Sequence, residues 1–173
     1  MVLGASSSLN AQEKVLNSEQ VGFSFAGSEL VLDGMYNIPV SDGPTSVVTE
    51  DDQLALRLDE KSSASSTRYA YLAIDDSLIF GGPFNGEFVI TYKADQAGSF
   101  RIHYDSLETG KRHQATEYVN IEEEDVGKWL TTTRAFTGAQ FVNSQNGGAD
   151  CRIAASGGVT VCVQALTLRI TSE

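Results

Sequence analysis

The chain has 173 residues, which is enough for one domain with a complete core and too few for two full domains. It carries 23 acidic and 12 basic side chains, a formal net charge of −11, and 41% of its residues are apolar. So acidic a chain repels phosphate backbones and anionic lipid headgroups, which argues against nucleic acid and membrane surfaces as partners. No stretch approaches the roughly 20 apolar residues of a membrane-spanning helix.

The amino-terminal segment, residues 1–14, is small, Ser-rich and weakly apolar. It resembles the end of a bacterial secretory signal, with Ala11 placed as a cleavage-site residue, but it lacks the basic start and the full apolar stretch of such a signal. We interpret it as a signal remnant or a disordered lead-in, and we expect a secreted protein, extracellular or periplasmic. A single domain is then expected over residues 15–173, where no repeat, low-complexity tract or linker occurs.

The rest of the chain is a series of short strand-like runs separated by Gly, Asp, Asn and Ser, with almost no helical periodicity. The predicted strands are residues 21–26, 29–32, 46–49, 53–58, 67–74, 87–94, 99–104, 116–121, 129–136, 149–154 and 159–170. Many short strands without intervening helices predict an all-β fold, an antiparallel β-sandwich of the jelly-roll kind.

Alternation along the strands assigns side chains to the two faces of a sheet. Phe100, Ile102 and Tyr104 share one side of their strand, whereas Arg101 and His103 share the other. The apolar side should lie in the core, and the polar side should form a solvated outer or concave face.

Tyr69 and Tyr71 share one side of the strand at residues 67–74, and the pattern leaves open which side of this strand is buried. They can form a pair of exposed rings only if Leu72 and Ile74 are the buried residues. In that case Arg68 joins the buried side, unless the strand begins after it.

The order of the strands also predicts where the long loops gather. Consecutive antiparallel strands place their connections alternately at the two ends of a sandwich, so residues 75–86, 105–115 and 137–148 should meet at one end. The shorter loops at the other end are residues 95–98, 122–128 and 156–158. Binding sites tend to lie on long loops held by a rigid scaffold, so we expect a site at the long-loop end.

Two cysteines, Cys151 and Cys162, flank a turn signal at residues 154–158. If Ser156 and Gly157 form a two-residue turn, the cysteines face each other across a hairpin, and a disulfide is geometrically reasonable. A loop register that differs by one residue moves them out of opposition, so two buried free thiols are an equal alternative.

Several segments, taken in order, resemble a known family. They are residues 69–76, 79–82, 88–92, 100–105, 127–129 and 141–153, the last of which contains the distinctive run Asn-Ser-Gln-Asn-Gly-Gly-Ala-Asp. Over about residues 65–170 the chain resembles the galactose-binding-like jelly-roll carbohydrate-binding modules of bacterial polysaccharide-active enzymes. It departs from that pattern at Cys151, where an aromatic residue is expected. The resemblance implies a non-catalytic module that binds a polysaccharide and is covalently linked to a degradative domain, without specifying the sugar.

Sugar binding requires aromatic rings for the C–H faces of the pyranose and polar side chains for its hydroxyl groups. The predicted long-loop end offers both kinds. The candidate binding residues are Phe84, Asn85, Lys111, Arg112, His113, Gln114, Asn143, Gln145 and Asn146. Residues 111–113 are the only basic cluster of the chain, which favours a sulfated or carboxylated plant or algal polysaccharide. The alternatives are a charged, soluble loop tip at residues 111–113 and plain Asx turns at residues 143–150.

Metal binding has little support in the residue pattern. Two histidines and two cysteines lack zinc-ligand spacing, so no cofactor is expected to be required. A structural calcium ion suits modules of this resemblance. Its candidate ligands are Glu29, Asp33, Asp75, Asp76 and Asp150, although surface acidity explains each of them better.

Catalysis is the alternative function, as a small jelly-roll polysaccharide lyase or glycoside hydrolase. A hydrolase needs two carboxylates in a cleft, and the acidic runs at residues 75–76 and 122–125 place neighbouring carboxylates on opposite faces. A lyase could combine His103 and Tyr104 with Arg101 or Asn120, but Tyr104 is predicted to face the core. A structural or adhesive spacer is a third possibility.

Overall fold

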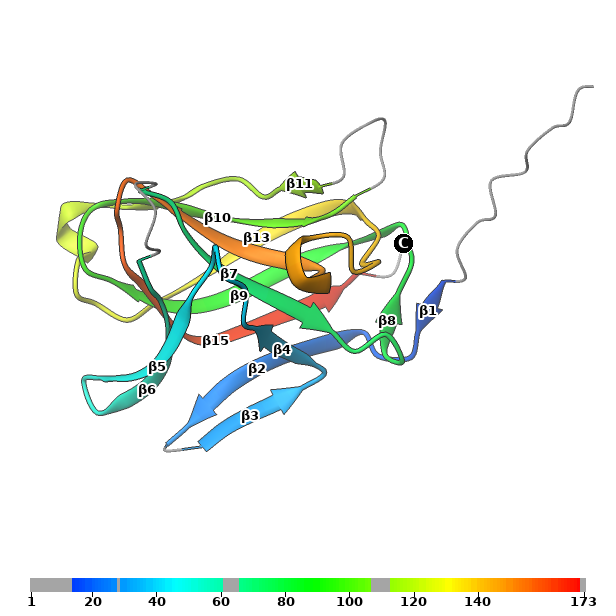
Figure 1. Cartoon of the computed structure of the whole chain (residues 1–173), viewed down its shortest axis with the longest axis horizontal. Coiled ribbons are helices and arrows are strands. Elements are labelled where there is room, and N and C mark those ends of the chain that lie inside the picture. The colour runs from blue at the N-terminus through cyan, green and yellow to red at the C-terminus, as the bar shows by residue number, and fades with distance from the viewer. Residues whose placement is uncertain (1–13, 28, 61–65, 107–112, 172–173) are drawn as a thin grey trace, which may run out of the picture.

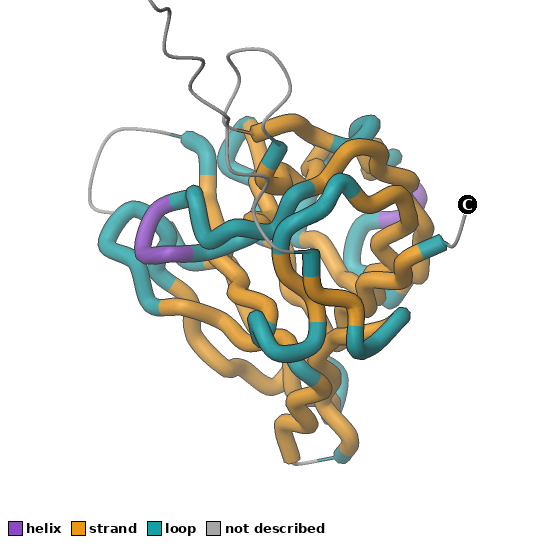
Figure 2. Tube along the Cα trace, turned by 90° about the vertical axis from the view of Figure 1, so that its right-hand side faces the viewer, coloured by secondary structure: helices purple, strands orange, loops and turns teal. Residues whose placement is uncertain are grey.

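The structure, a computed structural model, describes residues 14–27, 29–60, 66–106 and 113–171 of the chain. It is a β-sandwich in which two antiparallel sheets pack together (Figure 1). Within the described residues, the only helices are two short 3₁₀ turns, η1 (Glu123–Asp125) and η2 (Asn146–Gly148), which Figure 2 shows in purple. None of the described helices has the length and apolar character needed to cross a membrane. The predicted all-β sandwich is confirmed.

Among the described residues, one sheet has six strands and the other has seven. In order, the six-stranded sheet contains β11 (His113–Ala115), β10 (Gly98–Asp105), β14 (Cys151–Ser156), β7 (Arg68–Ile74) and β4 (Met35–Ile38), with β12 (Val119–Ile121) also paired to β10. The seven-stranded sheet contains β13 (Leu130–Ala139), β9 (Phe84–Ala94), β15 (Val161–Ile170), β2 (Gln20–Ala26) and β3 (Glu29–Asp33), with β6 (Gln53–Leu58) paired to β15 and β5 (Thr45–Glu50) to β6. β1 (Val15–Leu16) and β8 (Ile79–Phe80) form a separate pair.

The core lies between the two sheets and is rich in aromatic rings. Tyr92 of β9 meets Phe100 of β10 edge to face, with ring centroids 4.8 Å apart. Phe88 of β9 likewise contacts Tyr104 of β10, at 6.4 Å. Ile102 is fully buried beside them, so the inward side of β10 is the one that its alternation predicts. Each such side chain contributes about 1.5–3 kcal/mol through burial.

The short strands β1, β8 and β11 have no counterpart among the predicted strands, and two other differences have a local cause. Residues 116–121 do not form a single strand. At Thr116 the side-chain Oγ1, in place of a backbone carbonyl, accepts the hydrogen bond from the Ile102 backbone N–H, at 3.2 Å. β4 is absent from the predicted strands, since its four residues follow Gly34 and carry little periodic signal.

The long loops gather at one end, as the strand order predicts. Gly81 N–H donates to the carbonyl oxygen of Phe141, at 3.2 Å, and the Gln140 N–H donates to the carbonyl oxygen of Asp105, at 3.0 Å. At the opposite end Asp95 N–H donates to the carbonyl oxygen of Thr160, at 3.2 Å. Residues 107–112, the middle of the long loop at residues 105–115, lie outside the described residues.

The predicted hairpin between the two cysteines does not form. Cys151 lies on β14 in the six-stranded sheet and Cys162 on β15 in the seven-stranded sheet, and both are buried free thiols. The connection between the two strands crosses from one sheet to the other, with Gly157 and Gly158 at positive φ, so no hairpin places the cysteines in opposition. The disulfide is therefore not formed, and the free-thiol alternative holds.

We expect neither thiol to react with Ellman's reagent in the native protein. Burial raises the pKa of Cys151 well above its usual value and that of Cys162 to about 11, so the reactive thiolate is scarce at neutral pH. After unfolding in guanidinium without a reducing agent, both thiols should titrate. Denatured, unreduced protein that shows no free thiol would contradict this assignment.

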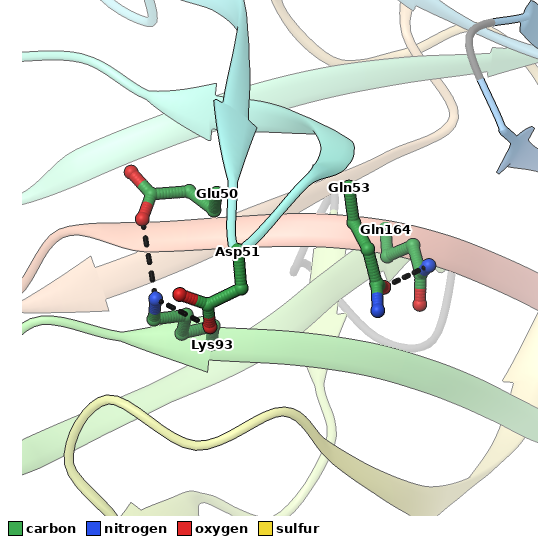
Figure 3. A network of polar contacts seen from close by, with 5 residues as sticks. All are labelled: Glu50, Asp51, Gln53, Lys93 and Gln164. Atoms are coloured by element: carbon green, nitrogen blue, oxygen red, sulfur yellow. Dashed lines mark hydrogen bonds and ion pairs between the residues drawn. The ribbon is translucent and has the colours of Figure 1, made fainter.

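The outer face of the seven-stranded sheet carries paired charges (Figure 3). Lys93 Nζ donates to Glu50 Oε2, at 3.2 Å, and to Asp51 Oδ2, at 2.9 Å. Gln164 Nε2 donates to Gln53 Oε1 alongside them. These contacts orient the β5–β6 hairpin, and exposed ion pairs of this kind contribute only about 0–1 kcal/mol each.

Candidate functional site

The structure gives Phe84 a role in the core. Its side chain is 3% exposed and its ring stacks on Phe141, with centroids 6.1 Å apart. The Lys14 ammonium lies 4.6 Å over the same ring, beside a cavity of about 270 Å³ that Asn85 also lines. Asn85 Oδ1 accepts a hydrogen bond from Gly138 N–H, at 3.1 Å. Phe84 therefore offers no open ring face to a sugar, which corrects that part of the predicted site.

The loop at residues 140–150 has two parts with different roles. Asn143 builds the loop: it has a φ of +59°, and its amide donates to the carboxylate of Asp76 at 3.1 Å. Gln145 Nε2 donates to the carbonyl oxygen of Asp150, at 2.9 Å, and so ties the loop to β14. Asn146, in η2, instead reaches β7, where its amide donates to the Tyr71 hydroxyl at 3.3 Å.

His113 and Gln114 lie on the edge strand β11. His113 is exposed, and its ring centroid is 5.5 Å from that of His103 on β10. Gln114 Oε1 accepts a hydrogen bond from the Tyr104 hydroxyl, at 3.2 Å, which ties it to a buried core residue. The predicted residues Lys111 and Arg112 lie outside the described residues.

Two buried carboxylates hold the long loops in place. Asp150 is 1% exposed; its Oδ2 accepts from Ile74 N–H and its Oδ1 from Asn143 N–H, both at 2.9 Å. Asp105 Oδ2 accepts from Ser144 N–H, at 2.8 Å. Burial raises the pKa of Asp150 to about 7 and also raises the pKa of Asp105. These carboxylates are structural acceptors that fix the position of residues 140–150.

The candidate calcium ligands do not converge. Both oxygens of Asp150 are used by backbone N–H groups, and Asp75 Oδ1 accepts from the Ser77 hydroxyl and N–H. Glu29 and Asp33 stand at the two ends of β3, which is exposed along its length. Within the described part of the chain no group of three or more His, Cys, Asp or Glu side chains is arranged to hold a metal. Calcium binding stays a prediction.

A cluster that was not predicted as a unit lies on the outer face of the six-stranded sheet. It comprises Tyr69 and Tyr71 of β7, Arg152 of β14, and Arg101 and His103 of β10, and we call it the arginine–tyrosine face. The register of the three strands arranges these residues in two rows. In the first row Tyr71, Arg152 and His103 are neighbours across the strands. In the second row Tyr69 and Arg101 lie on either side of Ala154. Leu72 and Ile74 are buried on the opposite side of β7, but Tyr71 is fully buried as well, so Tyr69 alone of the pair keeps exposed ring surface. Arg68 starts the strand and donates to the Thr160 hydroxyl.

The arginines of this face are stacked on aromatic rings. The Arg152 guanidinium lies 5.0 Å from the ring centroid of Tyr69 and 5.7 Å from that of Tyr71, and its Nη1 donates to the Tyr71 hydroxyl at 3.2 Å. The Arg101 guanidinium lies 4.7 Å over the ring of Tyr118. Each contact of this kind contributes about 0.5–2 kcal/mol, so the guanidinium groups are held in place before any ligand arrives.

Several polar atoms at this face are buried without a partner among the described residues: Arg152 Nε, His103 Nδ1 and Asp42 Oδ1. Arg101 Nε donates to His103 Nε2 at 3.2 Å, which assigns the imidazole proton to Nδ1. Burial, with the nearby Arg152 and Arg101, lowers the pKa of His103 to about 4, so it is neutral at physiological pH. Buried polar atoms in folded proteins nearly always have partners, and either an ordered water or a ligand at this face can supply the missing ones.

The residues considered for lyase chemistry do not assemble. Tyr104 is 3% exposed, and its hydroxyl also donates to the carbonyl oxygen of Thr137, inside the core. His103 faces the other side of β10, so the two side chains cannot act on one substrate. The acidic run that contains η1 has no buried residue in that turn and lies at the short-loop end.

A second concavity is apolar. It has a volume of about 240 Å³ and is lined by Leu30 and Leu32 of β3, Tyr36 of β4 and Val47 of β5, together with core phenylalanines. Apart from Asn37 it offers few polar groups for sugar hydroxyls, so it suits a carbohydrate less well than the arginine–tyrosine face.

Comparison with known proteins identifies the fold. No protein-family model and no curated protein matches the sequence. The structure is similar to that of the N-terminal CBM22-1–GH10 modules of a Clostridium thermocellum endo-1,4-β-D-xylanase complexed with xylohexaose, with a TM-score of 0.53 and 13% identity over 94% of this chain. This chain spans 29% of that xylanase chain. A family 29 carbohydrate-binding module from Piromyces equi gives a TM-score of 0.52 and 13% identity, over 90% of this chain and 93% of that module. The chain has the β-sandwich fold of these carbohydrate-binding modules.

Proposed function

We propose that this chain is a non-catalytic module that binds a polysaccharide on its arginine–tyrosine face. The observation that carries the proposal is the stacking of Arg152 on Tyr69 and Tyr71 beside buried polar atoms that have no partner among the described residues. Aromatic rings combined with polar groups of fixed orientation are what a sugar-binding surface needs.

The parts of this face have complementary tasks. The partly exposed Tyr69 offers ring surface to the C–H groups of a pyranose, while Tyr71 lies fully buried beneath the cluster. Ala154 lies between Tyr69 and Arg101 in the strand register and is buried by its neighbours. Hydroxyl groups of the sugar can bond to Asp42 and Asn146 at the edge. Because these groups are already held by mutual contacts, binding orders few side chains.

The same fold supports the proposal of an accessory role to a degradative enzyme. In the xylanase structure a module of this fold is joined to a GH10 domain. We therefore propose a covalently linked catalytic domain in the natural protein and a secreted location, where polysaccharides are found. The module would keep such an enzyme on its substrate without turnover of its own.

Affinity electrophoresis through gels that contain soluble polysaccharides tests this proposal. The panel holds xylan, glucomannan, galactan, alginate, polygalacturonate and a sulfated galactan. At least one polymer should retard the wild-type module, and Tyr69→Ala should reduce that retardation about tenfold or more, as expected for an aromatic hot spot.

Tyr36→Ala is the matched control, since Tyr36 is another exposed tyrosine but lines the apolar concavity. It should migrate like the wild type. If Tyr36→Ala abolishes retardation while Tyr69→Ala keeps it, the ligand lies in the apolar concavity and the proposed site is wrong. If no polymer retards the wild type, carbohydrate binding itself is wrong.

A further inference from the structure

The basic side chains on the two outer faces of the sandwich have different partners. On the seven-stranded sheet, Arg57, Lys93 and Arg169 each form an ion pair with a carboxylate, as Figure 3 shows for Lys93. On the arginine–tyrosine face, neither Arg101 nor Arg152 forms an ion pair with any described residue. In a chain with 23 acidic and 12 basic side chains, two neighbouring guanidinium groups without a carboxylate suit an anion from outside.

The groups without partners on β10 and β14 are hydrogen-bond donors. Arg152 Nε and His103 Nδ1 are buried N–H groups, and neither has an acceptor among the described residues. Arg152 and His103 are opposite each other across the two strands, where Cβ atoms lie about 4.5–5.5 Å apart, and Arg101 is two residues along the same side of β10. A carboxylate is a pure acceptor with two oxygens, so it suits this pair of donors, which are closed to solvent in this structure and have to be uncovered as the ligand binds.

The other titratable groups near this face, His113 and Asp42, do not form ion pairs with its arginines. His113, on β11, has a pKa that is lowered by burial and by Arg152, so it is neutral at physiological pH. Asp42 is the carboxylate that does reach the face, and its Oδ2 accepts from the Tyr71 hydroxyl, at 3.0 Å, and from Asn146. Asp42 forms no ion pair with Arg152, and its Oδ1 is a buried acceptor, suited to a hydroxyl donor.

We infer that the polysaccharide contains uronic acid units, with the sugar carboxylate seated against Arg101, His103 and Arg152 and ring hydroxyls directed toward Asp42. The donors on β10 and β14 and the acceptor beside β7 divide the face into an anion-binding part and a hydroxyl-binding part. This inference rests on the proposed function, because it names the sugar class that the same face takes.

The central comparison is between polygalacturonate and its fully methyl-esterified form, which share a backbone and differ in the charge of the carboxyl group. Alginate is a second uronate with a different backbone, and κ-carrageenan is a galactan that carries sulfate and no carboxylate. The wild type should bind at least one uronate polymer about tenfold or more tightly than the ester. Raising NaCl from 50 to 500 mM should weaken this binding severalfold, since salt screens the contact.

Arg101→Gln is the informative variant, because it removes a guanidinium that stacks on the exposed Tyr118 outside the core. It should lose about tenfold in uronate affinity. Arg169→Gln, on the other outer face, is the control and should bind like the wild type. Circular dichroism confirms that each variant is folded.

The outcomes separate the two proposals. Equal binding to the acid and the ester, unaffected by Arg101→Gln, overturns the uronate inference and leaves the proposed function standing. A preference for carrageenan over both uronates would show that the face selects sulfate and not carboxylate, and this result also overturns the uronate inference. A wild type that binds none of these polymers and none of the neutral panel overturns both proposals.

Discussion

Replacing Asp150 with alanine should lower the free energy of unfolding by about 2–6 kcal/mol. Its two carboxylate oxygens accept hydrogen bonds from the backbone N–H groups of Ile74 and Asn143, at 2.9 Å each. The variant leaves both N–H groups without that partner, and a buried N–H without an acceptor costs about 1–3 kcal/mol. Urea denaturation followed by fluorescence measures the change.

The matched control is Asp76→Ala. Asp76 is exposed and accepts hydrogen bonds from the side chain of Asn143 in the same loop, so its loss should cost less than about 1 kcal/mol. If the two variants lose similar stability, Asp150 does not hold the loop as described. Because Asp150 also fixes the loop that carries Asn146, Asp150→Ala should bind carbohydrate more weakly as well, even under conditions where it remains folded.

Arg152→Ala should weaken carbohydrate binding about 30-fold or more. Arg152 joins the two halves of the face: its guanidinium stacks on both tyrosines of β7, and its Nε is one of the buried donors. Its removal takes away the proposed ligand contact and the guanidinium that packs on the two rings, and central interface arginines commonly contribute 2 kcal/mol or more. Isothermal titration calorimetry with a retained oligosaccharide measures the loss.

The fold should survive this substitution, since the stacking contacts contribute about 0.5–2 kcal/mol each. Arg169→Ala serves as the control, because Arg169 stacks on no ring of the arginine–tyrosine face and pairs with Glu87 on the other sheet. Wild-type affinity in Arg152→Ala, measured on a folded sample, would falsify the placement of the site on this face.

Local sequence pattern was sufficient for the faces of individual strands. The alternation of Phe100, Ile102 and Tyr104 with Arg101 and His103 predicts correctly which side of β10 is buried, because side chains alternate with a period of two. The strand breaks were harder to predict. At Thr116 a side-chain hydroxyl replaces a backbone acceptor of the ladder, and a threonine in a β-rich run gives no sign of this.

The path of the chain between sheets was not predictable from local signals. Gly157 and Gly158 mark a turn, but a turn within a hairpin and a turn that crosses between sheets use the same residues. The outcome depends on which strands β14 and β15 pair with, and those partners are distant in sequence. For this reason the sequence placed each cysteine on a strand but did not decide whether the two strands belong to the same sheet.

For the site, as for the fold, local pattern was informative and long-range strand pairing was not predictable. The outward side of three strands carries Tyr69 and Tyr71, then Arg101 and His103, then Arg152. The sequence placed Arg101 and His103 opposite the core, but it left the side of the two tyrosines open and did not assign Arg152 to a face. Their assembly depends on the strand order β10–β14–β7, which is set by pairings between distant segments. The predicted site at the long-loop end includes Asn146 and His113, which contact this face from two sides through Tyr71 and His103.

The most direct test of the account is an NMR titration of ¹⁵N-labelled protein with two probes, hexagalacturonate and xylohexaose. The account predicts shift changes along β7, β14 and β10, centred on Tyr71, Arg152 and His103, that saturate at lower concentration with hexagalacturonate. Changes that gather instead around Leu32 and Val47, in the apolar concavity, would contradict it. So would the absence of any change with both probes.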